Sequence, residues 1–140
     1  MNDKKIKLFA DGLKIDQFDI DFGVEVDGYT FNPSIFKNHG AKDYLNYSKE
    51  LVSKSKNKPI SLEVFADSKD QMVEQAKILN DLGNNIFVKI PITYTNQKYT
   101  TDVLEILVKN KIQINLTAIF THNQIKRVSP ILKDTQTILS

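Results

Sequence analysis

The sequence has no cysteine, no tryptophan and only 2 histidines among its 140 residues. Without cysteine, the chain cannot form disulfide bonds, thiolate zinc sites or a thiol nucleophile. No apolar run approaches ~18 residues, the length that a transmembrane helix needs. The N-terminal stretch MNDKKIKLF carries charges and no apolar segment. We therefore expect no signal peptide, no membrane association and a cytoplasmic location.

Charge is modest and of both signs. The net charge is +2, and 26% of the residues are charged while 41% are hydrophobic, which is typical of a soluble globular protein. We expect residues 1–140 to form a single domain. No run of lysine and arginine is interleaved with aromatic residues, which argues against a nucleic acid partner. His39 and His122 have no carboxylate or histidine at ligand spacing, so we expect no metal site.

Short strand-like stretches alternate with longer helix-like ones along the chain. The expected strands are residues 6–10, 25–29, 60–65, 86–90, 113–118 and 137–139. The segments between them have helical periodicity, and repeated βα units predict a parallel sheet.

The expected helices have recognisable boundary signals. Ser68 with Gln71, and Thr121 with Gln124, have the spacing of a capping box. Gly40 is expected to divide residues 33–56 into two helices, and Pro130 to kink or break the last helix.

Six strands in a chain of this length fit two architectures. One is a doubly wound sheet of five or six strands. The other is a parallel TIM-type (β/α)₈ barrel that is incomplete, with about five βα units and a sixth strand, because a full barrel needs ~200 residues or more. The chain ends in the strand-like TQTILS without a closing helix, which favours the incomplete barrel.

Alternation within the strands separates an apolar face from a polar one. In NIFVKI, for example, Ile86, Val88 and Ile90 oppose Phe87 and Lys89. Parallel strands covered on both faces are nearly continuously apolar, so polar residues near the strand ends need an explanation. In barrels this end of the strands is the active-site end. The polar residues offered there are Asp11, Thr30, Asn32, Glu63, Lys89, Asn115 and Thr117.

Each of these residues also has a structural interpretation. Lys89 could lie on an edge strand, or its stem could run along apolar surface with the charge in water. Alternatively, it is a buried amine, partly neutral near pH 7, that attacks a carbonyl to form a Schiff base. Glu63 and Asp11 could be ion-pair partners of lysines or general acid/base groups. Asn32 before Pro33 could simply cap a helix.

Four motifs in order resemble the transaldolase family. GYTFNPS at 28–34 resembles its G-x-T-T-N-P-S signature, and VKIPIT at 88–93 resembles its Schiff-base lysine motif. INLTAIFT at 114–121 is similar to its N-L-T-x-x-F-S segment, and FADG at 9–12 to its first-strand turn. Each motif alone is modest, and the four together cover the whole chain at βα spacing.

The resemblance implies class I aldolase chemistry on a sugar phosphate, with a dihydroxyacetone unit transferred as in the pentose phosphate pathway. Lys89 would form the Schiff base, Asp11 would be the acid/base of C–C cleavage, and Glu63 with Thr117 would hold a water. The implied substrate-binding residues are Thr30, Asn32, Asn115 and Ser140. No metal or organic cofactor is implied, because the iminium accepts the electrons of the broken bond. Assembly into a homo-oligomer is an alternative that the sequence does not decide.

The chain also departs from the family pattern. Phe31 replaces the second threonine of the signature, and Glu63 fits transaldolases where fructose 6-phosphate aldolases have glutamine. Ser140 matches the serine of a family strand, S-P-F-x-G-R, whose phosphate-binding arginine would lie beyond it. The sequence is therefore expected to represent the N-terminal part of a barrel. The alternatives are a non-catalytic relative that binds a sugar phosphate or a partner, and a fructose 6-phosphate aldolase-type lyase.

Overall fold

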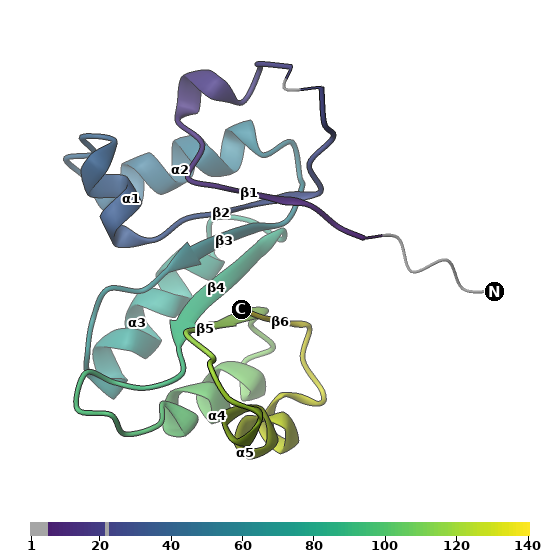
Figure 1. Ribbon diagram of the computed structural model, residues 1–140. Helices are drawn as coiled ribbons and strands as arrows, with labels where there is room; N and C mark the ends of the chain where they lie inside the picture. Colours follow the sequence, from purple (N-terminus) through teal and green to yellow (C-terminus); the bar gives the residue numbers. More distant parts are fainter. Residues whose placement is uncertain (1–5, 22) are drawn as a thin grey trace.

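The computed structural model describes residues 6–21 and 23–140, and it contains one parallel sheet of 6 strands (Figure 1). The strands lie side by side in the order in which they occur in the sequence. They are β1 (Phe9–Asp11), β2 (Gly28–Thr30), β3 (Ile60–Glu63), β4 (Ile86–Pro91), β5 (Ile114–Thr117) and β6 (Thr137–Leu139). Sequential order excludes the doubly wound alternative, whose strand order reverses at a switch point. The expectation of a leader-free N-terminus falls partly on residues 1–5, outside the described part.

The helices lie along one side of the curved sheet, and its other, concave side carries no helix of the described chain (Figure 1). The elements are the 3₁₀ helix η1 (Ile15–Gln17) and the helices α1 (Pro33–Asn38), α2 (Tyr44–Lys54), α3 (Lys69–Asn80), α4 (Thr101–Lys109) and α5 (His122–Leu132). The sheet with its helices is an open half-barrel, which confirms the incomplete (β/α) barrel expected from the sequence. In the described residues, no helix is long and apolar enough to cross a membrane.

The predicted division of each strand into two faces is confirmed most clearly in β4. Ile86, Val88 and Ile90 are completely buried in the core that the helices cover, whereas Phe87 and Lys89 are half-buried on the opposite face. The same parity puts Leu62 in the core and Glu63 on the open, concave face. Apolar burial beneath the helices thus holds the strands, and it leaves the polar residues directed into the half-barrel.

The first two strands begin later than expected. The predicted strand at 6–10 is β1 at Phe9–Asp11, and the one at 25–29 is β2 at Gly28–Thr30. Ile6 and Val24 are 81% and 57% exposed, so their apolar character does not reflect burial in this sheet. Alternation of apolar residues cannot show where pairing with a neighbouring strand starts, and this is why the expected starts were wrong.

Helix boundaries agree with the sequence except at two places. Ser68 precedes α3 as expected, but its hydroxyl donates to Gln71 Oε1 at 3.0 Å and does not cap a backbone amide. Pro130 does not break α5, which continues through it to Leu132. Position 130 lies in the last turn of α5, so the missing amide removes a single hydrogen bond near a helix end. Thr121 and Gln124 do form the predicted capping box.

Candidate active site

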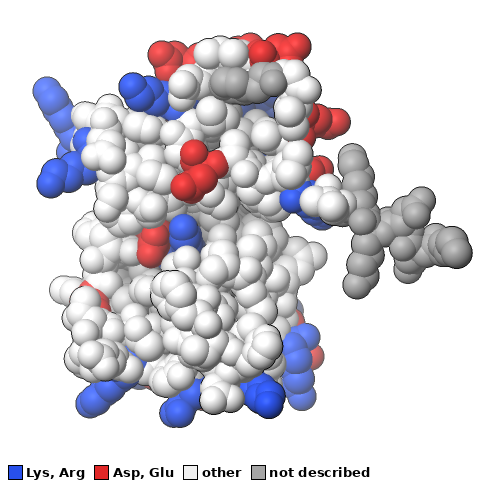
Figure 2. Space-filling model, viewed as in Figure 1, with Lys and Arg blue, Asp and Glu red and all other residues white. Residues whose placement is uncertain are grey.

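The central polar residues lie in one row across the sheet. Glu63 pairs in register with Lys89, and Lys89 with Asn115, on the adjacent strands β3, β4 and β5. Residues in register share a face, so the three side chains all enter the concave side. In Figure 2 the middle of the visible face is mostly uncharged, with one acidic and one basic group side by side and a further acidic group above them.

Lys89 and Glu63 form an ion pair within the half-barrel. Lys89 Nζ lies 3.9 Å from Glu63 Oε2, and their side chains are 13% and 17% exposed. At this distance the charges attract one another without a direct hydrogen bond, so the amine stays free to approach a third group. The interpretation of Lys89 as an edge-strand lysine is wrong, because β4 has a neighbour on each side.

Burial dominates the electrostatics of Glu63. Removal of the carboxyl group from water raises the pKa of Glu63, and the positive charge of Lys89 opposes that shift only in part. A larger fraction of Glu63 therefore carries a proton near neutral pH than is the case for an exposed glutamate. Such a group can both donate and accept a proton.

Asn115 is held from both ends. Its Nδ2 donates to Ser61 Oγ at 2.9 Å, and its Oδ1 accepts from Ser140 Oγ at 2.8 Å. Asn115 is 1% exposed and Ser61 0%, so these bonds replace water almost completely. The two bonds hold the carboxamide in place between β3 and the residue that follows β6.

Asp11 and Thr30 form a second polar pair, on the edge strand β1 and its neighbour β2. The residues are in register on β1 and β2, and Thr30 Oγ1 donates to Asp11 Oδ1 at 2.6 Å. Asp11 is exposed to solvent on the open side. The hydrogen bond fixes one carboxylate oxygen and leaves the other to water or a ligand.

The two remaining predicted site residues on strand ends differ in their roles. Asn32 Oδ1 accepts the amide of Ile35 at 2.9 Å and caps α1, so its oxygen serves the helix and only its amide nitrogen can meet a ligand. Thr117 ends β5 in register with Pro91, two positions beyond Asn115, and is half-buried. Its hydroxyl is directed from the same face as Asn115.

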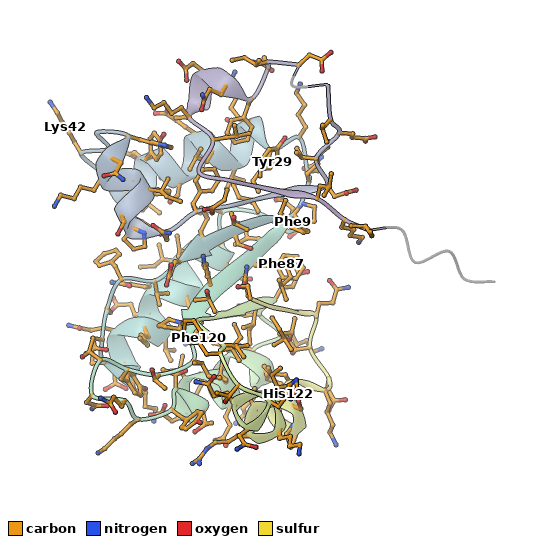
Figure 3. The ribbon with its side chains drawn as sticks, in the orientation of Figure 1. Phe9, Tyr29, Lys42, Phe87, Phe120 and His122 are labelled. Atoms are coloured by element: carbon orange, nitrogen blue, oxygen red, sulfur yellow. The ribbon has the colours of Figure 1, made fainter. Side chains whose placement is uncertain are left out.

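The floor of the half-barrel is aromatic. Phe9 begins β1 and Phe87 lies near the start of β4, so both are at the end of the strands away from the polar groups (Figure 3). Phe9 is in register with Gly28, and a Cβ at Gly28 would come within 2.5 Å of its ring. Glycine at this position lets the Phe9 ring cover β2, so the polar residues stand on an apolar base.

The structure thus arranges the predicted residues in contact groups: Lys89 with Glu63, Asp11 with Thr30, and Asn115 with Ser140. Among the described residues, the side chains of Asn32 and Thr117 have no hydrogen bond or ion pair with another member. Ser61 joins this arrangement through Asn115 and was not predicted from the sequence. Its position two residues before Glu63, on the same face of the strand, was the available signal.

Neither histidine joins this site. His39 Nδ1 is hydrogen-bonded to Tyr47 Oη at 2.9 Å behind the sheet, and His122 begins α5 in an exposed position. Within residues 6–21 and 23–140, no group of three or more His, Asp or Glu side chains is placed to hold a metal ion. The chemistry available in the half-barrel is therefore that of an amine, carboxyl groups, hydroxyls and carboxamides.

Comparison with known proteins agrees with this set of groups. The model of the transaldolase/fructose-6-phosphate aldolase family matches residues 8–135, which is most of the chain. The chain belongs to this family. The resemblance inferred from the four motifs is confirmed.

Relatives of the chain are described as probable transaldolases. One from Methanococcus maripaludis is 36% identical over 121 residues, covering 85% of this chain and 53% of the relative. One from Thermoplasma volcanium is 35% identical over 119 residues, covering 82% of this chain and 51% of the relative. One from Methanococcus vannielii is 39% identical over 99 residues, covering 71% and 43%. The chain therefore spans about half the length of the curated relatives it matches.

Proposed function

We propose that this chain provides the Schiff-base centre of a transaldolase that transfers a dihydroxyacetone unit between sugar phosphates. The observation that carries the proposal is the position of Lys89. Its amine stands in the middle of the concave face, 3.9 Å from a buried carboxyl group whose pKa is raised by desolvation. An amine beside a group that can supply and remove protons is the arrangement that Schiff-base formation requires.

The first half of the reaction follows from these two residues. In the proposal, the Lys89 ammonium passes a proton to Glu63, and the neutral amine then attacks the ketone carbon of the sugar. A second proton moves from the nitrogen to the carbonyl oxygen, which becomes the hydroxyl of a carbinolamine. Protonated Glu63 gives its proton to that hydroxyl, which leaves as water, and an iminium remains on Lys89. Thr117 lies on the same rim and is suited to hold this water with Glu63.

The second half of the reaction, C–C cleavage, requires a base at the sugar hydroxyl on the far carbon of the bond that breaks. In the proposal, Asp11 removes that proton, the C–C bond breaks, and its electron pair passes into the iminium. Asp11 lies across the half-barrel from Lys89, with one oxygen fixed by Thr30. A substrate held between β1 and β4 would thus meet the acid/base and the amine at different carbons.

The remaining polar groups are suited to bind the dihydroxyacetone hydroxyls. Thr30, Asn32, Asn115 and Ser140 all lie at the same end of the strands. Asn32 offers only its amide nitrogen, because its oxygen caps α1. Ser61 and Ser140 hold Asn115 in place, and one N–H and one oxygen lone pair of its carboxamide remain for a ligand.

Borohydride trapping tests the proposal. The 140-residue chain is incubated with fructose 6-phosphate and sodium borohydride, and the adduct is located by peptide mass mapping. Trapped dihydroxyacetone or sugar on Lys89, absent in Lys89→Ala, is the expected result. Lys7→Ala, on the exposed segment before β1, is the matched control. An adduct that persists without Lys89 would sink the assignment.

A non-catalytic role in partner binding is the second candidate. Within the described residues, β1 and β6 each have a neighbouring strand on one side only. Leu8 and Leu139 are each 46% exposed at these edges. Open edges with apolar residues favour pairing with another polypeptide. Sedimentation of the chain over a range of concentrations, with Leu139→Lys as the comparison, distinguishes this role from monomeric catalysis.

A further inference from the structure

The backbone carbonyl of Glu63 has lost its expected partner in the sheet. Along the β2–β3 ladder, the amide of Tyr29 donates to the carbonyl of Pro59 at 2.8 Å, and that of Phe31 to Ser61 at 2.9 Å. The next donor in this alternation is residue 33, which would reach Glu63. Position 33 is proline, which has no amide hydrogen, and it is the first residue of α1.

Tyr44 fills this gap from outside the sheet. It is the first residue of α2, and its hydroxyl donates to the carbonyl oxygen of Glu63. The ring is fixed between two others, with its centroid 4.4 Å from that of Phe36 and 5.2 Å from that of Phe65. The hydroxyl is therefore held in place by packing on both sides.

The residues that follow Glu63 are fixed in the same manner. Gln75 of α3 accepts the amides of Phe65 and Ala66 with its Oε1, at 2.9 and 3.0 Å. Two helices thus supply, by side chains, the hydrogen bonds that the end of β3 lacks. These bonds set the backbone from which the Glu63 side chain enters the half-barrel opposite Lys89.

We infer that Tyr44 is a positioning residue for Glu63, acting from the helical side of the sheet on the carboxyl group that faces Lys89. The inference rests on the proposed function only in giving Glu63 a catalytic purpose. Without the hydroxyl, the Glu63 carbonyl must find water, and the end of β3 moves toward solvent. The carboxyl group then gains hydration, and its distance to Lys89 is no longer fixed.

Tyr44→Phe tests this with a matched control, Tyr47→Phe. Tyr47 lies on the same helix, contacts the same Phe36 ring at 4.9 Å, and also loses a hydroxyl hydrogen bond, but to His39 and not to the sheet. The Glu63 carboxyl is followed by ¹³C NMR in the full chain labelled at glutamate, with Glu63→Gln for assignment. The titration midpoint is expected to fall toward that of exposed glutamates in Tyr44→Phe and to stay unchanged in Tyr47→Phe.

A second measurement follows adduct formation on Lys89. Tyr44→Phe is expected to slow borohydride trapping about tenfold at saturating sugar, with an unchanged half-saturating concentration, because it affects a step after binding. Equal Glu63 titrations in wild type, Tyr44→Phe and Tyr47→Phe would overturn the inference. So would a midpoint that moves equally in both variants. If wild type forms no adduct, the proposed function fails, and the titration still decides the role of Tyr44.

Discussion

Glu63 and Lys89 face one another from β3 and β4 at the same register position, with Glu63 Oε2 3.9 Å from Lys89 Nζ. Neither side chain is more than 17% exposed. The pair joins two requirements of Schiff-base chemistry, an amine and a nearby proton donor, on the one face that no described helix covers.

Replacement of Glu63 by glutamine should slow Schiff-base formation on Lys89 while the fold persists. The glutamine side chain is isosteric but cannot deliver a proton to the leaving hydroxyl, so we expect a loss of roughly 10²-fold in the trapping rate. The measurement is the time course of the borohydride-trapped mass. Glu74→Gln, an exposed position on α3, is the control and should trap at the wild-type rate. Equal rates for both variants would remove Glu63 from the reaction.

The raised pKa of Glu63 also predicts a pH dependence of stability. The folded chain retains the Glu63 proton above its ordinary pKa of 4.5, where the unfolded chain has released it. The folded state then binds more protons, so the free energy of unfolding decreases as pH rises from 4.5 through the raised pKa. Relative to wild type, Glu63→Gln should gain stability over this interval, as measured by urea unfolding at a series of pH values.

Asp19 provides a control of opposite sign. Lys54 donates to its carboxylate at 3.0 Å, and this hydrogen bond and charge lower the pKa of Asp19. The stabilisation that the ionised Asp19 gives the folded state is fully present above its ordinary pKa of 3.8. It is lost as pH falls through the lowered pKa. Asp19→Asn should therefore differ from wild type most at neutral pH and least in acid. A Glu63→Gln profile with the same sign would contradict the assignment of burial as the main cause.

The buried bond between Ser61 and Asn115 should contribute more to stability than the bond to Ser140. Ser61→Ala leaves the Asn115 amide without a partner in the interior, which costs about 1–3 kcal/mol. Ser140 is exposed, so water can replace its hydroxyl, and Ser140→Ala should cost less than about 0.5 kcal/mol. Equal losses in urea unfolding would show that Asn115 is not closed off from solvent.

The apolar face of β4 should dominate the stability of the half-barrel. Ile90 is completely buried, and Ile90→Ala is expected to cost about 2–5 kcal/mol through lost burial and the cavity it leaves. Ile20 is 52% exposed, and Ile20→Ala should change the free energy of unfolding by less than about 0.5 kcal/mol. Circular dichroism during urea titration measures both. Similar losses would mean that β4 is not at the centre of the core.

Much of the strand geometry around the candidate site could be predicted from local pattern. The alternation of Ile86, Val88 and Ile90 with Lys89 showed which face the lysine occupies, because successive side chains in a strand point to opposite sides. The bounds of β6 at Thr137–Leu139 also agree. The observed starts of β1 and β2 lie later than predicted, because pairing depends on the neighbouring strand and not on the residues of one strand alone. Asn32 could not be assigned beforehand, since capping and ligand binding use the same side chain.

The sequence by itself determined the order of βα units, the face of each strand and the family, because these depend on periodicity and short motifs. Only the tertiary structure decided which side chains are hydrogen-bond partners of one another. Ser61 meets Asn115, 54 residues away, because β4 sets the register between their strands. Tyr44 reaches the carbonyl of Glu63 because Pro33 leaves that acceptor free and α2 packs beside it. Contacts of this kind depend on how elements distant in sequence meet, which no local pattern records.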